Sequence, residues 1–343
     1  MPARRSPSAC IAYPLALLAC CVPAFADYGA TPAFDLGGLL FGDAYYVASH
    51  HSAAGDGATG LVLRRGYLTA NAAFGKHWRG RARIEVNQDG DFETYSFETR
   101  LKDLYLARKF EQRELVLGLS PTLTYDLIES TWGARYLMRT PLDLQGVPSR
   151  DTGVTLKGRF GSNDSLGYRV MYGSGLEYAN QGGGGDKLMA ALTWFPSASL
   201  YVDVYTDYEK RSGPTDRRTW QLFAGRKSEL LRWGLQYSHQ DREDDPNLEL
   251  ASAFVVRRLR DDLSVIGRVD RLLEPSPRGD DIAYVPFDPT AKATMILAGL
   301  EYRLSPVFRM TPNVIWTTYG VNADGARPED DLHLRVTFFL DLE

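Results

Sequence analysis

Three arginines at alternate positions form the most distinctive chemical pattern in this chain of 343 residues. Arg79, Arg81 and Arg83 are separated from one another by single small residues. Alternate side chains of a β-strand project from the same face, so a strand here would carry a ladder of guanidinium groups. Such a ladder could attract anions into a water-filled space. It could equally be polar lining whose charges serve only to hold water, and the sequence leaves both interpretations open.

The ladder is the centre of a larger candidate basic wall, made of residues expected on the same face of neighbouring strands. Its members are Arg65, Arg79, Arg81, Arg83, Lys109, Lys157 and Arg159. Several acidic residues are expected to face the same space: Glu85, Asp203, Asp207 and Asp270. These carboxylates would offset part of the basic charge, which is why the sign of any selectivity is left open.

A second group of charges lies in the segment 121–149, which has the composition of a long loop. It combines acids with bases: Asp126, Glu129, Arg135, Arg139 and Asp143. These charges could fasten the loop to the wall through ion pairs. The aromatic residues Tyr125, Trp132 and Tyr136 could offer a contact for sugars or aromatic solutes, but packing of the loop against the rest of the protein is the interpretation we prefer.

Sixteen stretches of alternating apolar and polar residues are available to position these side chains. Such alternation is typical of β-strands that are buried on one face only. In the last stretch every even-numbered residue is apolar, whereas the odd-numbered ones include His333 and Arg335. The stretch 248–259 has apolar residues on both faces, and its polar side is left unassigned. The expected strands are 34–48, 59–74, 77–88, 98–110, 113–120, 150–160, 164–174, 186–195, 199–209, 217–227, 230–240, 248–259, 262–273, 292–304, 307–318 and 330–342.

Short and long connections alternate along the whole series of strands. That asymmetry is typical of outer-membrane barrels, which have short turns at one end and long loops at the other. Strands of about ten residues are long enough to cross a bilayer when tilted. Since lipid cannot bond to backbone amides, the strands must also close into a barrel. The sequence therefore predicts an all-β protein, a closed antiparallel transmembrane β-barrel of about 16 strands in contact with membrane lipid. A secreted soluble β-protein is the least favoured alternative.

The first residues have the pattern of a cleaved export signal. Arg4 and Arg5 precede an apolar run, and Ala24-Phe25-Ala26 is a typical cleavage site. We expect a signal peptide at 1–26 and the barrel at 27–343; lipidation at Cys20 or Cys21 is an alternative. All three cysteines lie before residue 27, so the mature barrel would have no thiol. With 43 acidic against 39 basic residues, the chain lacks the positive charge usual for binding nucleic acid.

The number of strands and the long loop between the fifth and sixth of them resemble the sixteen-stranded porins of Gram-negative bacteria. The segments 118–121 (Gly-Leu-Ser-Pro) and 140–146 (Thr-Pro-Leu-Asp-Leu-Gln-Gly) are also similar to the phosphate-selective and related porin-like group. One departure is the ending Leu340-Asp341-Leu342-Glu343, because porins usually end on an aromatic residue.

The resemblance implies a channel in the cell outer membrane that admits small hydrophilic solutes or ions by passive diffusion. It also implies that 121–149 is a constriction loop, whose acids face the basic wall and create a transverse field. General porins are trimers, so a homotrimer is implied but not identified by any residue. A channel specific for an anion or oligosaccharide is one alternative. A barrel serving as an enzyme or as a sleeve for a protein partner is another.

The histidines give little indication of catalysis or metal binding. His50 and His51 lie near Asp56, and this group could bind a metal weakly, but a solvated pair in a loop is the preferred interpretation. His239 with Asp241 and the acids at 243 and 244 has some similarity to the Asp/His sites of barrel proteases. No Ser, His and acid have a spacing that requires a catalytic triad. We therefore expect no enzymatic activity, no metal and no cofactor.

Overall fold

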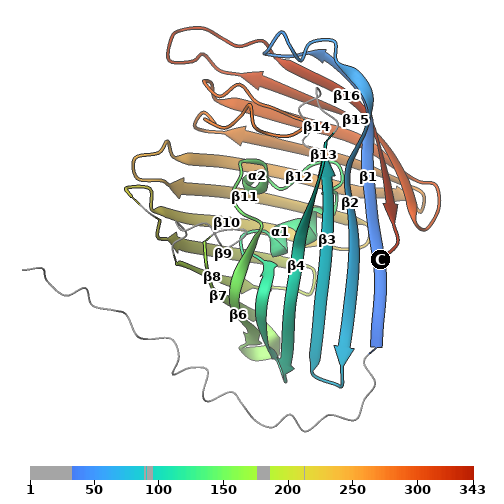
Figure 1. Ribbon diagram of the computed structural model, residues 1–343, viewed down its shortest axis with the longest axis vertical. Helices are drawn as coiled ribbons and strands as arrows, with labels where there is room; N and C mark the ends of the chain where they lie inside the picture. The colour runs from blue at the N-terminus through green and yellow to red at the C-terminus, as the bar shows by residue number, and fades with distance from the viewer. Residues whose placement is uncertain (1–32, 89, 91–95, 176–185, 212) are drawn as a thin grey trace, which may run out of the picture.

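The barrel closes between the first and the last strand of the chain. The computed structural model describes residues 33–88, 90, 96–175, 186–211 and 213–343, so the expected signal peptide lies outside the described residues. Each strand pairs antiparallel with its neighbours in the chain, and β1 pairs with β16 (Figure 1). The strands are β1 (Ala33–Ser49), β2 (Thr59–Phe74), β3 (Trp78–Gln88), β4 (Phe97–Phe110), β5 (Arg113–Pro121), β6 (Arg150–Phe160), β7 (Leu166–Gly173), β8 (Lys187–Trp194), β9 (Leu200–Glu209), β10 (Arg217–Lys227), β11 (Leu231–Asp241), β12 (Leu248–Arg260), β13 (Leu263–Leu272), β14 (Ala293–Arg303), β15 (Phe308–Tyr319) and β16 (Asp331–Asp341).

The predicted fold class is confirmed, and so are all of the predicted strands. Their ends differ from the expected ones by no more than two residues. The predicted alternation of faces also holds. In β9, Tyr201 and Tyr205 are buried on the inside of the barrel, whereas Val204 between them is 55% exposed on the outside. The alternation of apolar and polar residues identified these strands because most of them have an apolar outer face and a more polar inner face.

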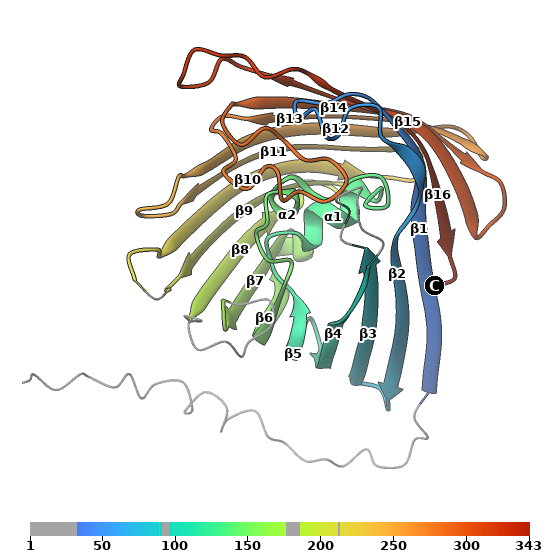
Figure 2. The ribbon, with the colours of Figure 1, turned by 45° about the horizontal axis from the view of Figure 1, so that its top comes forward.

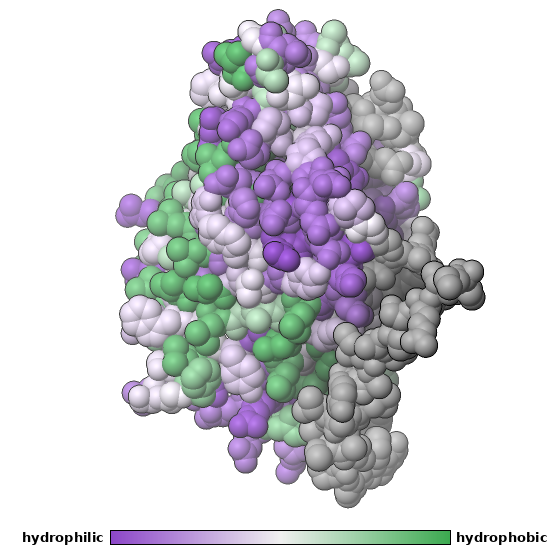
Figure 3. Space-filling view, turned by 90° about the vertical axis from the view of Figure 1, so that its left-hand side faces the viewer, coloured by the Kyte–Doolittle hydropathy of each residue, from purple (hydrophilic) through white to green (hydrophobic). Residues whose placement is uncertain are grey.

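The two ends of the barrel differ in the length of their connections. One end, called the short-turn end below, has turns such as 75–77 and 111–112; the other, the long-loop end, carries the longer segments. None of the described helices is long and apolar enough to cross a membrane. On the face drawn in Figure 3, hydrophilic residues cover much of the upper and central part, and hydrophobic residues gather to the left and below.

One long connection, called loop 3 (residues 122–149), folds into the barrel and carries α1 (Asp126–Trp132) and α2 (Pro141–Leu144). Figure 2 shows both helices inside the ring of strands. Helix α1 lies against β10, β11 and β12. The ring of Trp132 meets the ring of Phe254 on β12 edge to face at 5.1 Å. The expected inward fold of the third long loop is therefore confirmed.

A second connection, called loop 7 (residues 273–292), also enters the barrel, which the sequence did not lead us to expect. Its apolar side chains Ile282, Tyr284, Val285 and Phe287 are buried, and they join loop 3 in one apolar cluster with the inner face of the wall. The hydroxyl of Tyr284 donates to the carbonyl oxygen of Gln88 at 2.8 Å. A run of apolar residues at 282–287, inside an otherwise polar loop, was the available signal.

The two loops explain why β12 is apolar on both faces. Its inner residues Leu248, Leu250, Phe254 and Val256 are buried in the same apolar cluster as the loops. The even-numbered residues of this strand, which could not be assigned from the sequence, therefore face inward. An inner face that carries protein rather than water needs apolar side chains, because burying them is what holds the loops in place.

Candidate functional site

The arginine ladder of β3 lies on the inner face of the barrel and lines the space that loop 3 leaves open. Arg81 and Arg83 border a cavity of about 330 Å³, called the central cavity, together with Asp126 and Glu129 of loop 3. The arginines belong to β3 of the wall, and the two acids belong to α1 of loop 3. The structure thus brings together part of the expected basic wall and two of the three expected acids.

A larger cavity of about 750 Å³ adjoins the central one and shares Asp126 and Ser130 with it. This cavity, called the vestibule, lies at the short-turn end. Its basic lining residues are Lys76, Arg79, Lys109, Arg113, Lys157, Arg159 and Arg169. Its acidic lining residues are Glu111, Glu114, Asp126 and Asp164. The excess of basic residues gives the vestibule a positive wall, and four members of the predicted basic wall belong to it.

Carboxylates next to the ladder neutralise part of its charge. Asp103 on β4 lies 2.6 Å from Arg150 and within 3.9 Å of both Arg81 and Arg83. The side chain of Glu343 pairs with Arg83 and lies 3.8 Å from Arg81. The guanidinium groups are therefore held in a network of ion pairs, which fixes their positions in the lumen.

The acids that the sequence placed beside the wall are also paired in the lumen. Their ion pairs, with distances between charged atoms, are Glu85 with Arg65 (3.5 Å) and Lys102 (3.6 Å), Asp203 with Arg169 (2.6 Å), Asp207 with Lys187 (3.2 Å) and Asp270 with Arg268 (2.5 Å). Close pairing compensates for removing these charges from bulk water.

The remaining charges of loop 3 pair within the loop itself. Asp143 forms ion pairs with Arg135 and Arg139, and Arg135 also lies 3.3 Å from Glu129. Burial alone would raise the pKa of Asp143, but the two guanidinium groups lower this pKa below its ordinary value. Asp143 is not among the residues that line the central cavity, so of the three expected acids only Asp126 and Glu129 share this cavity with Arg81 and Arg83.

Hydrogen bonds to the loop backbone, rather than ion pairs of Arg135 and Arg139, fasten loop 3 to the wall. Arg268 on β13 donates to the carbonyl oxygen of Arg139 at 2.6 Å. Arg64 on β2 donates to the carbonyl oxygens of Tyr136 and Leu137. These contacts add to the packing of the aromatic residues. Tyr125, Trp132 and Tyr136 are almost fully buried, which confirms their expected packing role.

A small cavity of about 30 Å³ adjoins the central cavity on the side of loop 7. Arg64, Arg65, Arg135 and Arg139 line it, and no carboxylate occurs among its described lining residues. Its other walls are Phe41, Met138, Leu144, Ala283, Tyr284 and Val285. This space is much smaller than the vestibule or the central cavity. We call these four side chains the arginine cluster.

Comparison with known proteins links this barrel to porins by shape. No protein-family model matches the sequence, and no curated protein matches it. An anion-selective porin from Comamonas acidovorans superposes with a TM-score of 0.64 at 14% sequence identity, covering 91% of this chain and 100% of that chain. The fold is that of the sixteen-stranded porins. OmpT of Vibrio cholerae superposes with a TM-score of 0.61 at 12% identity, covering 91% of this chain and 98% of that chain. OmpF of Salmonella typhi, in complex with daunomycin, gives 0.60 at 10% identity, with 90% and 97% covered.

Two basic residues that the sequence reasoning missed enter the lumen of this porin fold through β-bulges. The pairing of β1 with β2 shifts between Phe41 and Gly42, so Arg64 is an extra residue and lies inside together with Arg65. The pairing of β3 with β4 shifts in the same way at Lys102, which is buried beside Asp103. A bulge turns two successive side chains to one face. Two consecutive charged residues within a strand were the available signal.

The structure corrects the expectation for the first histidine pair. His50 and His51 do not form a solvated group with Asp56; they lie against Asp331 at the start of β16, and His50 is only 6% exposed. The ring of His239 packs against the ring of Trp220 on β10, with 5.6 Å between the centroids.

Proposed function

We propose that this chain is an outer-membrane porin that lets small hydrophilic solutes diffuse passively and favours anions. The arginine cluster carries the preference for anions, because four guanidinium groups and no carboxylate line a cavity of about 30 Å³. Their partner carboxylates lie behind this lining, for example Asp43 at 2.8 Å from Arg64 and Glu85 at 3.5 Å from Arg65. The basic vestibule supports the same sign of selectivity. Charged residues at the narrow part of a channel set which ion crosses it at the lower electrostatic barrier. That the anion-selective Comamonas porin has the same fold is consistent with this assignment.

The route that we propose runs from the vestibule through the central cavity to the arginine cluster, with loop 3 as the constriction. Adjoining cavities with shared lining residues support this route: Asp126 and Ser130 on one side, Phe41 and Arg135 on the other. Ion pairs hold the charged side chains in place along it. Since the last space is much smaller than the other two, we expect a small unitary conductance.

We further propose that residues 1–26 direct export and are removed, that the short turns face the periplasm and that the long loops face outward. This orientation follows the general asymmetry of outer-membrane barrels. A homotrimer is the assembly we propose, supported by the solved trimer form of Vibrio cholerae OmpT, which has the same fold.

A triple substitution of Arg79, Arg81 and Arg83 by Gln tests the selectivity. We expect the reversal potential of the mature protein, measured in a planar bilayer under a salt gradient, to move toward cation preference, because three positive charges leave the lumen. The matched control replaces Arg260, Arg278 and Arg327 by Gln, since these side chains are more than half exposed outside the cavities. Equal reversal potentials for the two triple variants would refute the role of the wall. A channel that never conducts would refute the porin assignment itself.

A channel specific for one anion is the second candidate, and the arginine cluster is the observation that favours it. Guanidinium groups bind phosphate and carboxylate through paired hydrogen bonds, so several of them around a small space suit such a group. Titrating inorganic phosphate against chloride conductance separates the two candidates. A saturable block would support a specific site, whereas a current proportional to concentration would support simple diffusion.

A further inference from the structure

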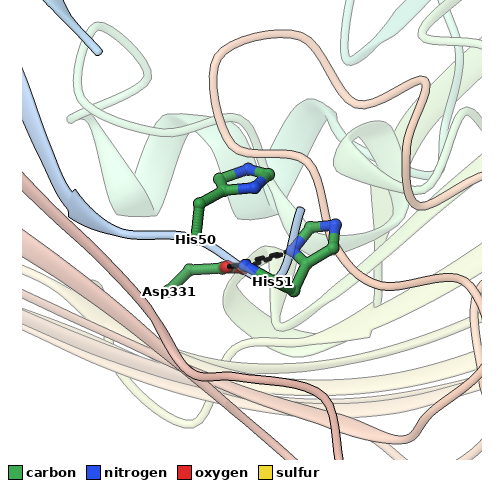
Figure 4. A group of neighbouring side chains, drawn as sticks. All are labelled: His50, His51 and Asp331. Carbon is green, nitrogen blue, oxygen red and sulfur yellow. Dashed lines mark hydrogen bonds and ion pairs between the residues drawn. The ribbon is translucent and has the colours of Figure 1, made fainter. Parts of the chain in front are cut away.

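A cluster of two histidines and one aspartate lies at the seam where the barrel closes, away from the cavities described above. His50 and His51 directly follow β1, and Asp331 is the first residue of β16, which pairs with β1. One nitrogen of each imidazole and one carboxylate oxygen all lie within 4.8 Å of one another. Figure 4 shows the three side chains next to one another, where the end of β1 meets the start of β16.

The cluster is buried, and one of its nitrogens has no partner. His50 is 6% exposed and Asp331 is fully buried. Within the described part of the chain, the Nε2 atom of His50 has no hydrogen-bond partner, although it is buried. Leaving a buried polar atom unsatisfied is costly, so such an atom needs an explanation. A bound cation would supply the missing partner.

Each histidine already has an acceptor that could orient it for a metal. The Nδ1 atom of His50 lies 3.1 Å from the carbonyl oxygen of Ser52 and 3.0 Å from the backbone nitrogen of the same residue. If Nδ1 accepts the Ser52 N–H, the ring proton lies on Nε2; if Nδ1 donates to the carbonyl oxygen, Nε2 keeps a lone pair, and the metal site needs this second tautomer. The Nε2 atom of His51 lies 3.3 Å from a carboxylate oxygen of Asp280, while its Nδ1 atom lies 2.9 Å from Asp331. Histidines that ligate metals usually donate their second ring N–H to a carbonyl or carboxylate in this way.

We propose that His50, His51 and Asp331 bind a divalent transition-metal ion, with Zn²⁺ as the preferred occupant. Two imidazoles and a carboxylate are a typical ligand set for Zn²⁺ and leave a fourth position for water. Ligand atoms around tetrahedral Zn²⁺ are about 3.4 Å apart, given bonds of about 2.0–2.1 Å. In the present structure the three ligand atoms lie within 4.8 Å of one another, so metal binding would draw the two buried imidazoles and the carboxylate closer together.

A metal at this position would link the two strands between which the barrel closes. It would join the end of β1 to the start of β16, which already meet through a hydrogen bond from Ser49 to the carbonyl oxygen of Asp330 at 2.7 Å. Through His51 and Asp280 it would also hold loop 7, which covers the arginine cluster. A ligand that binds only the folded barrel raises its stability by mass action. The proposal is independent of whether the channel conducts.

The experiment titrates Zn²⁺ into tag-free mature protein in detergent micelles and measures binding by calorimetry and the midpoint of thermal unfolding. We expect one site per chain and an unfolding midpoint that rises with Zn²⁺ and returns with a chelator. His50→Gln should weaken binding by about tenfold or more, since metal sites lose 10–100-fold affinity even when only supporting groups change. His50 is the first choice because Asp331 also accepts the backbone N–H of His51 and the hydroxyl of Tyr319, so replacing it threatens folding.

His77→Gln is the matched control, because His77 is exposed in a turn at the opposite end of the barrel. It should bind Zn²⁺ like the natural chain. Cobalt offers a second readout, since its visible absorption identifies tetrahedral nitrogen and oxygen coordination, and His50→Gln should abolish that band. The proposal is overturned if the natural chain binds no Zn²⁺ at micromolar concentration. It is equally overturned if His50→Gln and His77→Gln bind with the same affinity, which would indicate adventitious binding.

Discussion

Two parts of the lumen wall have the same strand geometry but differ in what their inward side chains contact. On β12 and β14, called the apolar half below, most inward side chains are apolar, and Phe254 and Met295 are buried in the same cluster as the inserted loops. On β3 and β6, called the charged half below, most inward side chains are charged, and residues such as Arg81 and Arg83 border open cavities. One half is thus the core of a folded protein, and the other half is the wall of a water-filled space.

The difference shows that the inner face of a barrel strand is patterned by what it must contact. Where loop 3 and loop 7 dock, apolar side chains are removed from water on both sides of the contact, which stabilises the docked loops. Around the open cavities, charged side chains line the lumen, and carboxylates such as Asp103 hold the neighbouring arginines in fixed positions. The position of the pore is therefore determined by the apolar half as much as by the charged half.

Trp132→Ala is expected to have the largest effect, because it removes the anchor of loop 3 from the apolar half. Trp132 contacts Phe254, and its indole N–H donates to the carbonyl oxygen of Met138 at 2.9 Å. Truncating a buried tryptophan costs about 3–5 kcal/mol, which here is lost from the docking of the loop. We expect a larger and noisier unitary conductance and faster protease cleavage within residues 122–149.

Trp194→Ala provides the control for that change, since Trp194 is 53% exposed on the outer face. It removes the same side chain from the barrel but leaves the lumen untouched, so conductance and cleavage should remain those of the natural chain. If the two variants conduct alike, the apolar half does not hold the constriction.

The charged half could be read from the sequence better than the apolar half. Alternation located every strand and placed Arg79, Arg81 and Arg83 in the lumen, because periodicity is a local property of the chain. It could not reveal Arg64 or Lys102, whose direction depends on bulges set by the pairing of two strands. These bulges are a property of the sheet rather than of either strand alone.

The inserted loops also could not be predicted from local sequence patterns. The double-sided apolar pattern of 248–259 was visible, but its meaning depends on loop 7, which docks from a distant part of the sequence. The partners of His50 and His51 were missed for the same reason, since Asp331 lies 280 residues from His51 along the chain. Contacts between distant segments follow from closure of the barrel, which a reading of local patterns does not describe.

Glu343→Gln tests the charged half from the other direction, because it removes a negative charge and makes this part of the lumen more positive. The Glu343 carboxylate pairs with Arg83 and also accepts a hydrogen bond from Thr69 at 2.7 Å. Removing its charge leaves Arg81 and Arg83 less neutralised, so the reversal potential should move toward anion preference. The shift should be smaller than that of the triple arginine variant and opposite in sign, because one charge changes rather than three. Glu329→Gln, at an exposed loop position, should leave the potential unchanged; a shift toward cations in Glu343→Gln would contradict the assignment.

The smallest expected effect is a pH dependence of loop 3 that comes from Asp143. Its pKa in the folded protein is below the ordinary value, since Arg135 and Arg139 outweigh the opposing effect of burial. A carboxyl group with a lowered pKa stabilises the fold fully above its unfolded pKa of about 3.9. This stabilisation is lost as the pH falls through the lower folded pKa. Unitary conductance should therefore be the same at pH 7 and pH 5 and change only in more acidic solution. Asp143→Asn should remove most of the acid-induced change and loosen loop 3 already at pH 7. An acid profile identical to that of the natural chain would show that other carboxylates, such as Glu129, control the loop.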